Sequence, residues 1–320
     1  AGTENDTITA SGGTNTITAG DGNDTITLNN GINSVVAGTG VDTITAASGT
    51  NRIDAGDDAD VITLSGGNNT LLAGSGADSI TASNGTNVID AGTENDTITA
   101  SGGNNTITAG DGDDTIRLNN GINSVNAGVG ADTITASSGT NRIDAGNDAD
   151  VITLSGGNNT LLAGSGDDSI TTSGGTNTIA TDSGNNTVVL NDGTNSVTAS
   201  TGADTITASG GLNTINAGDG NDTITLNNGT NSVVAGIGAD TITASSGTNT
   251  IEAGNDADVI SLSGGNNTVY GGSGTDSITA SNGINVIDAG TENDTITASG
   301  GTNTITAGDG DDTVRLNNGT

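Results

Sequence analysis

The sequence lacks most of the residues from which an ordinary globular protein builds its core and its chemistry. Its 320 residues include no cysteine, histidine, proline, methionine, phenylalanine or tryptophan, and only one tyrosine. Without bulky side chains the chain cannot fill the core of an enzyme of this length, so any core has to be thin and long. Disulfides are excluded, and no Cys, His or Lys is present for nucleophilic or acid–base catalysis. The glycine-rich stretches precede strand-like rather than helical segments, so they are not phosphate loops. We therefore expect no enzyme activity.

Positive charge is almost absent as well. Four basic residues stand against 38 acidic ones, which gives a formal net charge of -34. This balance argues against nucleic acid and anionic membranes as partners and favours metal cations. No apolar run approaches the roughly 18 residues of a membrane span, and no targeting segment is recognisable. Because position 1 is not Met, we expect the chain to be a processed or excised piece of a longer product.

The sequence consists of a nine-residue motif that is repeated without insertion. Odd units read like residues 37–45 (AGTGVDTIT) and even units like residues 100–108 (ASGGNNTIT), and the two kinds alternate from end to end. A weaker superperiod relates residues 1–90 to residues 91–180, and an extra pair of units at 181–198 displaces the third copy. We predict a single continuous repeat domain over residues 1–320, with an irregular coil at 181–198.

Each unit divides into a turn and a strand. Numbering the places of a unit 1 to 9, places 1 to 6 collect Gly, Asn, Asp and Ser, which suit tight turns. Places 7 to 9 and the next place 1 alternate outward Thr with inward Ile, Val, Leu or Ala, as at Ile8, Ile17, Ile26 and Val35. Two units then close one coil. The prediction is an all-β fold, a parallel β-roll or two-sided β-solenoid of about 18 coils, each made of two nine-residue units. A three-sided helix is disfavoured because inward aliphatics recur at every ninth position, not at every sixth.

An aspartate recurs at place 6 of seventeen odd units, one above another at about 5 Å. Neighbouring carboxylates at that spacing repel by roughly 0.8 kcal/mol in water and about 3 kcal/mol at an effective dielectric of 20. Protonation or a cation therefore has to intervene, and oxygen ligands without any His or Cys favour Ca²⁺. The predicted ligands are Asp6, Asp24, Asp42, Asp60, Asp78, Asp96, Asp114, Asp132, Asp150, Asp168, Asp204, Asp222, Asp240, Asp258, Asp276, Asp294 and Asp312.

The odd units resemble the nonapeptide of the RTX (repeats-in-toxin) calcium-binding family, G-G-x-G-x-D followed by a short strand. Ala replaces the first Gly almost everywhere, and Gly271-Gly272 matches it fully. The resemblance implies a parallel β-roll in which each Ca²⁺ is shared by turns one coil apart, in a protein that is secreted unfolded and folds outside the cell. The even units depart from the family, since all of them carry Asn at place 6.

Counting the gaps between successive Asp turns gives up to about 15 calcium sites, nine from Asp6 to Asp168 and six from Asp204 to Asp312. Asn186 interrupts the row, so the flanking sites are expected to be missing or weakened. Acidic residues replace Gly at place 4 in six units, where they either add ligands or distort the turn; these are Glu4, Asp58, Glu94, Asp148, Asp256 and Glu292. The Asn edge is expected to form a metal-free amide ladder.

Burial of two aliphatics per coil does not offset the entropy of ordering a whole Gly-rich coil, so calcium is expected to drive folding. The predicted function is an extracellular, calcium-stabilised structural rod, roughly 85 Å long at about 4.8 Å per coil. It would belong to a long secreted adhesin or to a filament that self-associates end to end or side by side through its unpaired strand edges. The alternative is an ice-binding β-solenoid that uses the Thr-x-Thr face. The sequence leaves the native length, the adhesive target and the choice between spacer and fibre open.

Overall fold

The computed structural model describes residues 2–318, so Ala1, Gly319 and Thr320, at the ends of the predicted domain, lie outside the described residues. The chain divides into two compact units, residues 1–164 and 165–320. Every regular element in the described part is a β-strand, and all of the pairings between strands are parallel. The fold is a parallel β-solenoid of about 17 turns with 18 residues per turn, which confirms the predicted fold class.

The first unit opens with two strands that each run through most of a coil, and then alternates short with long strands. The opening pair is β1 (Thr7–Asp21) and β2 (Thr25–Thr39). The short strands are β3 (Thr43–Ala46), β5 (Val61–Leu64), β7 (Ser79–Ala82), β9 (Thr97–Ala100), β11 (Thr115–Leu118), β13 (Thr133–Ala136) and β15 (Val151–Leu154). The long strands are β4 (Thr50–Asp57), β6 (Asn68–Ser75), β8 (Thr86–Thr93), β10 (Asn104–Asp111), β12 (Ile122–Val129), β14 (Thr140–Asn147) and β16 (Asn158–Ser165).

The second unit continues the same alternation within itself. Its short strands are β17 (Ser169–Thr172), β19 (Thr187–Leu190), β21 (Thr205–Ala208), β23 (Thr223–Leu226), β25 (Thr241–Ala244), β27 (Val259–Leu262), β29 (Ser277–Ala280), β31 (Thr295–Ala298) and β33 (Thr313–Leu316). Its longer strands are β18 (Thr176–Ser183), β20 (Thr194–Thr201), β22 (Leu212–Asp219), β24 (Thr230–Ile237), β26 (Thr248–Asn255), β28 (Asn266–Ser273), β30 (Ile284–Thr291) and β32 (Thr302–Thr306).

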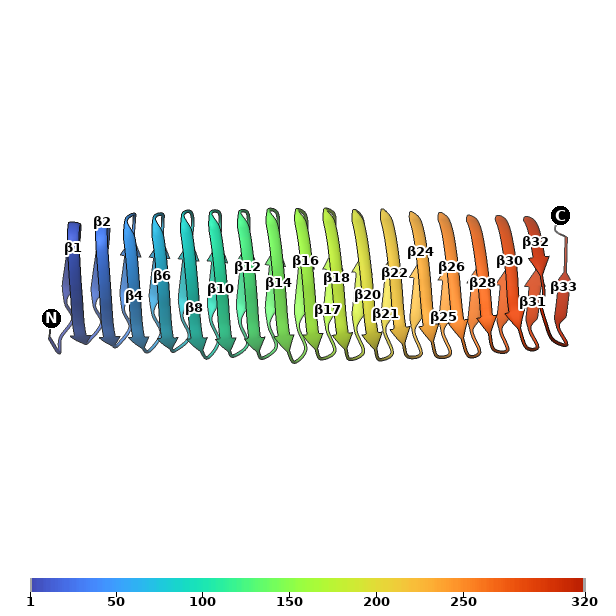
Figure 1. The fold of residues 1–320 in the computed structure, drawn as a ribbon, viewed down its shortest axis with the longest axis horizontal. Coiled ribbons are helices and arrows are strands. Elements are labelled where there is room, and N and C mark those ends of the chain that lie inside the picture. Colours follow the sequence, from blue (N-terminus) through green and yellow to red (C-terminus); the bar gives the residue numbers. More distant parts are fainter. Residues whose placement is uncertain (1, 319–320) are drawn as a thin grey trace. The chain divides into compact units, whose positions relative to one another are not determined.

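The register between neighbouring strands is one full coil in each unit, apart from shifts at Ser11 between β1 and β2 and at Asp182 between β18 and β20. Short strands pair with short ones, as where Ile44 of β3 lies opposite Ile62 of β5, and long strands pair with long ones, as where Ile53 of β4 lies opposite Leu71 of β6. Within each unit the strands therefore form two parallel ladders, whose members lie side by side in Figure 1. Identical places of the repeat are stacked into columns.

The core of each unit is the thin, aliphatic filling that the repeat predicts. Place 8 supplies Ile, Val or Leu and place 1 supplies mostly Ala or Leu, and outside the terminal coils these side chains are buried while their neighbours in the strand face solvent; in the last coil Val314 and Leu316 are exposed. Ile26 and Val35 are 0% and 1% exposed, and Ile17 is also buried; Ile8 is half-buried in the first coil. The inward orientation of place 8 is thereby confirmed.

The long strands exceed their predicted extent in both directions. The sequence predicts a strand over places 7 to 9 and the next place 1, which is residues 52–55 in β4, but β4 spans Thr50–Asp57. At its start, the place-6 Asn51 points inward as part of the strand, because its neutral amide stacks on the amides of adjacent coils. At its end, Gly56 pairs with Gly38 in the same ladder.

Nearly all odd units carry glycine at place 2, close to the end of the long strand. Gly56 adopts a φ of +115°, a conformation that side-chain-bearing residues rarely take. A Cβ atom there would overlap the carbonyl oxygen of Gly38 in the preceding coil. The close stacking of backbone on backbone at place 2 therefore accounts for the repeated Gly.

Candidate functional site

The aspartates at place 6 form a stacked row along one edge of each unit. They lie in the turns between a long strand and the next short strand, and in most of them the backbone carbonyl accepts the first N–H of the short strand one coil on, as Asp24 accepts from Thr43. Fifteen of the seventeen side chains are buried, with exposures of 0–1%; Asp6 and Asp312 in the terminal coils are half-buried. The structure thus brings the predicted site residues of each unit together in one column.

Within the row, each carboxylate is held by the coil before it. The backbone N–H of Asp78 donates to Oδ1 of Asp96 at 2.7 Å, and the N–H of Asp96 donates to Oδ1 of Asp114 at 2.7 Å. The same bond recurs along the rest of each row at 2.6–2.9 Å between successive aspartates. Sequence reasoning did not include this bond, although the constant spacing of one coil was its signal. It fixes the orientation of the carboxylates that accept it, from Asp24 to Asp150 and from Asp222 to Asp312.

The second carboxylate oxygen, Oδ2, is buried and has no hydrogen-bond partner. This holds for Asp6, Asp24, Asp42, Asp60, Asp78, Asp96, Asp114, Asp132, Asp204, Asp222, Asp240, Asp258, Asp276 and Asp294. Buried carboxylate oxygens without a donor are strongly unfavourable, and folded proteins rarely retain them. A proton or a cation beside these oxygens would remove the cost of burying them.

Burial also changes the acidity of these groups. Desolvation raises the pKa of Asp60, Asp96, Asp132 and Asp258 to about 7. The hydrogen bond from the backbone N–H of the preceding Asp lowers the pKa, but by less than desolvation raises it. Neighbouring carboxylates add to the rise. In the metal-free fold these groups therefore bind protons far more strongly than an exposed aspartate does.

The donor set suits a hard divalent cation. Carboxylate and backbone carbonyl oxygens are the ligands that Ca²⁺ prefers, and the chain offers no His or Cys to softer metals. Among residues 2–318, no three acidic side chains come close enough together to hold one ion by themselves. Backbone or water oxygens therefore have to complete the shell of any ion in this row.

The acidic residues at place 4 of the Asp edge adopt a second turn conformation. Asp58, Glu94, Asp148, Asp256 and Glu292 have φ values between +74° and +77°. Two of them bond to the coil before: Asp58 Oδ2 accepts the N–H of Gly40 at 3.1 Å, and Glu292 Oε2 accepts the N–H of Gly274 at 2.9 Å. Glu4 is not among the described residues with positive φ. Asp58 and Glu292 therefore link their own turn to the turn of the preceding coil through a hydrogen bond.

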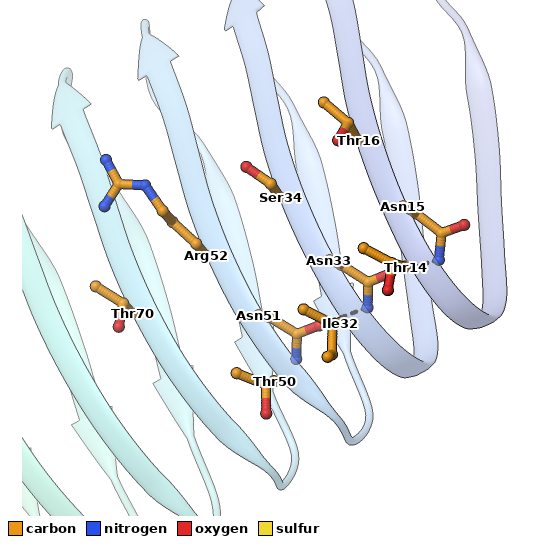
Figure 2. Close-up of a pocket in the computed structure, with 10 residues that line it drawn as sticks. All are labelled: Thr14, Asn15, Thr16, Ile32, Asn33, Ser34, Thr50, Asn51, Arg52 and Thr70. Carbon is orange, nitrogen blue, oxygen red and sulfur yellow. Dashed lines mark hydrogen bonds between the residues drawn. The ribbon is translucent and has the colours of Figure 1, made fainter.

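The opposite edge carries a row of amides that are fully engaged with one another. Asn33 Nδ2 donates to Asn51 Oδ1 at 2.7 Å, and Asn51 Nδ2 donates to Asn69 Oδ1 at 2.7 Å. Figure 2 shows this ladder at Asn15, Asn33 and Asn51. Each amide also reaches the carbonyl three positions before it, as Asn51 does to Ser48 at 3.1 Å. The Asn row satisfies its polar atoms internally, in contrast to the Asp row.

A shallow groove of about 230 Å³ crosses the outer face of the long strands near this ladder (Figure 2). Its outward-facing walls are Thr, Ser and Ile side chains, with Arg52 as its one basic residue. It contains no acid–base or nucleophilic pair of the kind that catalysis needs.

Comparison with known proteins gives a family and two matching chains of solved structure. A sequence model of four copies of the RTX calcium-binding nonapeptide repeat matches residues 1–35, 27–62, 63–98, 90–125, 119–152, 153–188, 190–224, 207–242, 225–260, 243–278, 252–287 and 279–314. No curated protein sequence matches the chain. A solved structure that is similar is the crystal structure of a hyperactive, Ca²⁺-dependent, β-helical antifreeze protein from an Antarctic bacterium. It shares 21% identity over 80% of this chain and 76% of that chain, with a TM-score of 0.42.

Proposed function

The chain belongs to the RTX calcium-binding nonapeptide repeat family, and on that premise we propose that it is an extracellular structural rod stabilised by calcium. It would serve within a long secreted adhesin or a self-assembling surface filament, and its role would be mechanical rather than enzymatic. The seventeen aspartates at place 6 are the proposed ligands, with up to about 15 Ca²⁺ shared between successive turns. No helix in the described part of the chain is long and apolar enough to cross a membrane.

The contrast between the two edges carries this proposal. Both rows stack side chains of the same shape, one per coil. The Asn side chains use both of their polar atoms, whereas the Asp side chains use Oδ1 and leave Oδ2 buried without a donor. A cation at the Asp edge would satisfy Oδ2 and remove the repulsion along the row. The Asn edge has no such need.

The calcium concentration outside cells suits such a site. Turn-built sites in extracellular modules bind Ca²⁺ in roughly the 10⁻⁴ to 10⁻³ M range. Sites of that strength would stay empty in cytosol and fill after secretion. Calcium would therefore couple folding of the chain to its arrival outside the cell.

Replacement of one carboxylate in the row tests the assignment of the ligands. In Asp96→Asn, Asn keeps an oxygen for the N–H of Asp78 but removes the charge, so we expect up to two fewer bound Ca²⁺ per chain and a lower melting temperature in calcium. The matched control is Asp90→Asn, which makes the same charge change at an exposed position of β8. Equilibrium dialysis gives the bound calcium. If Asp96→Asn binds as many Ca²⁺ ions as the wild type, the place-6 aspartates are not the calcium ligands.

A second candidate function, ice binding, is supported by the columns of Thr on the short-strand face. Places 7 and 9 stack in register, so that Thr25 lies opposite Thr43 and Thr27 lies opposite Thr45. Val61, Val151 and Arg117 interrupt these columns in the first unit. An ordered array of hydroxyl and methyl groups on a flat sheet is the feature that such a function requires.

Ice binding is tested by measuring thermal hysteresis, the gap between the melting and freezing temperatures, in a solution of the calcium-loaded chain. If the Thr columns bind ice, Thr43→Lys at an exposed position of the array is expected to lower the hysteresis severalfold. Thr70→Lys, at an exposed position of the long-strand face, serves as the control and should leave it unchanged. Absence of hysteresis in the wild type would exclude ice binding.

A further inference from the structure

One coil of the second unit, residues 172–189, departs from the repeat in several independent ways. It carries Thr instead of Ala or Leu at both of its place-1 positions, Thr172 and Thr181. It carries Asp182 where nearly all the other odd units have Gly, and Asn186 where they all have Asp. These changes affect the core, the backbone and the candidate metal row of the same coil.

The core of this coil contains two polar groups without partners. Thr172 and Thr181 are both 0% exposed, and neither hydroxyl makes a hydrogen bond. In the coils that follow, the same columns hold Leu190 and Ala199. A buried hydroxyl without a partner lowers the stability of the folded state relative to an aliphatic side chain of similar size. The aliphatic filling of the solenoid is therefore weakened at this coil.

The candidate metal row changes character in the same coil. Asn186 Oδ1 accepts the N–H of Asp168 at 3.0 Å, and its Nδ2 donates to the carbonyl of Gly184 at 3.2 Å. Its own N–H donates to Oδ1 of Asp204 at 2.7 Å. Asn186 thus continues the ladder of the row with both polar atoms of its side chain satisfied. At place 6 this coil therefore provides neither a charge nor an orphaned oxygen for a cation, and its Asp182 is exposed.

The backbone is irregular at Asp182, the residue that follows the buried Thr181. Asp182 has a φ of +55°, and the pairing between β18 and β20 shifts register on both sides of it. The regular coils of the second unit hold this pairing without such a shift, as between β24 and β26. The ladder of the long strands is therefore interrupted next to the altered turn.

We propose that residues 172–189 form a calcium-free joint in the second unit, at which the calcium-bound chain opens first. The proposal rests on the proposed role of the Asp row. Because stacked repeats contact only their neighbours, a weak coil limits how far folding and unfolding propagate. The turns from Asp204 to Asp312 then bind calcium as one block, and local opening at the joint leaves that block folded.

Amide hydrogen exchange of the calcium-loaded chain at residue resolution tests the joint. Strands β18 and β19 are compared with β24 and β25, which occupy the same places three coils later, where the Asp row is complete. We expect exchange in β18 and β19 to be at least roughly 10-fold faster. Equal protection of the two pairs would overturn the proposal. Failure of calcium to fold the chain at all would instead overturn the proposed function, and circular dichroism detects that separately.

Restoration of the consensus should remove the joint. The variant Thr172→Leu/Thr181→Ala/Asp182→Gly/Asn186→Asp uses residues that other coils carry at the same places, so we expect it to fold. It should slow exchange in β18 and β19 to the level of β24 and β25 and raise bound calcium by up to two ions per chain. Asn195→Asp, the same change at the Asn edge, should add no calcium, since the Asn195 amide is bonded to Asn213 and Asp192. Fast exchange that persists in the consensus variant would contradict the joint.

Discussion

Removal of calcium at about pH 8 is expected to unfold the chain completely. The core holds only two large aliphatics per coil, together with mostly Ala or Leu at place 1, which does not offset the conformational entropy of an ordered coil. In addition, the fold places ionised carboxylates in buried columns, where Oδ2 of residues such as Asp78 and Asp96 has no donor. We therefore expect the folded state to need the cation. A far-UV circular dichroism titration should show a coil-to-β transition in roughly the 10⁻⁴ to 10⁻³ M range of Ca²⁺.

Magnesium provides the control for this titration. Mg²⁺ prefers a smaller octahedral shell and gives up its water reluctantly, so at equal concentration it should leave most of the chain unfolded. Light scattering followed in the same samples separates two forms of the proposed function, since growth of scattering with folding favours a filament and its absence favours a spacer. A chain that is already β-structured in chelator would contradict the calcium-dependent fold.

Acidification without calcium is expected to restore β-structure. Burial raises the pKa of Asp60, Asp96 and Asp132 to about 7 in the fold, whereas an unfolded aspartate titrates near 3.8. A group whose pKa is raised on folding favours the folded state at low pH, and this contribution is lost as the pH rises through the folded-state value. In chelator, the chain should therefore be unfolded at about pH 8 and gain β-structure as the pH falls through about 7 and 6. Circular dichroism against pH measures the transition.

A variant with neutral side chains in the row checks the cause of this pH dependence. Asp60→Asn/Asp96→Asn/Asp132→Asn imitates the protonated row at three coils, as Asn186 does in the wild type. In chelator it should keep β-structure to a higher pH than the wild type, although it binds less calcium. An unchanged pH midpoint would show that groups other than the Asp row control the transition. The titration stops near pH 5, because a chain that loses its net charge precipitates.

Several parts of this molecule follow directly from the sequence. An uninterrupted period of nine, doubled to form one coil, allows only a stack of equal coils, and the spacing of Ile26 and Ile44 places identical side chains in register. The predicted columns of aliphatic, Asp and Asn residues are confirmed as columns within each unit. The assignment of calcium to the Asp column stays a prediction, supported by the family and by the geometry of the carboxylates.

Other parts were decided only by the tertiary structure. From the sequence, Asp60 and Asn51 both look like turn residues at place 6. In the fold Asn51 lies inside a strand, while Asp60 lies in a turn, because an amide can donate and accept along a stack and a carboxylate can only accept. For the same reason Asp60 needs a backbone N–H from the coil before and leaves Oδ2 without a donor.

The sequence by itself therefore determined the repeat, the register and the chemical type of each column, since these depend only on spacing. The tertiary structure decided which polar atoms are satisfied, how deeply each row is buried, and that Thr172 and Thr181 lack partners. Those properties depend on what the coils before and after place around a side chain. A nine-residue pattern does not contain that information, because each coil is completed by the coils on either side of it.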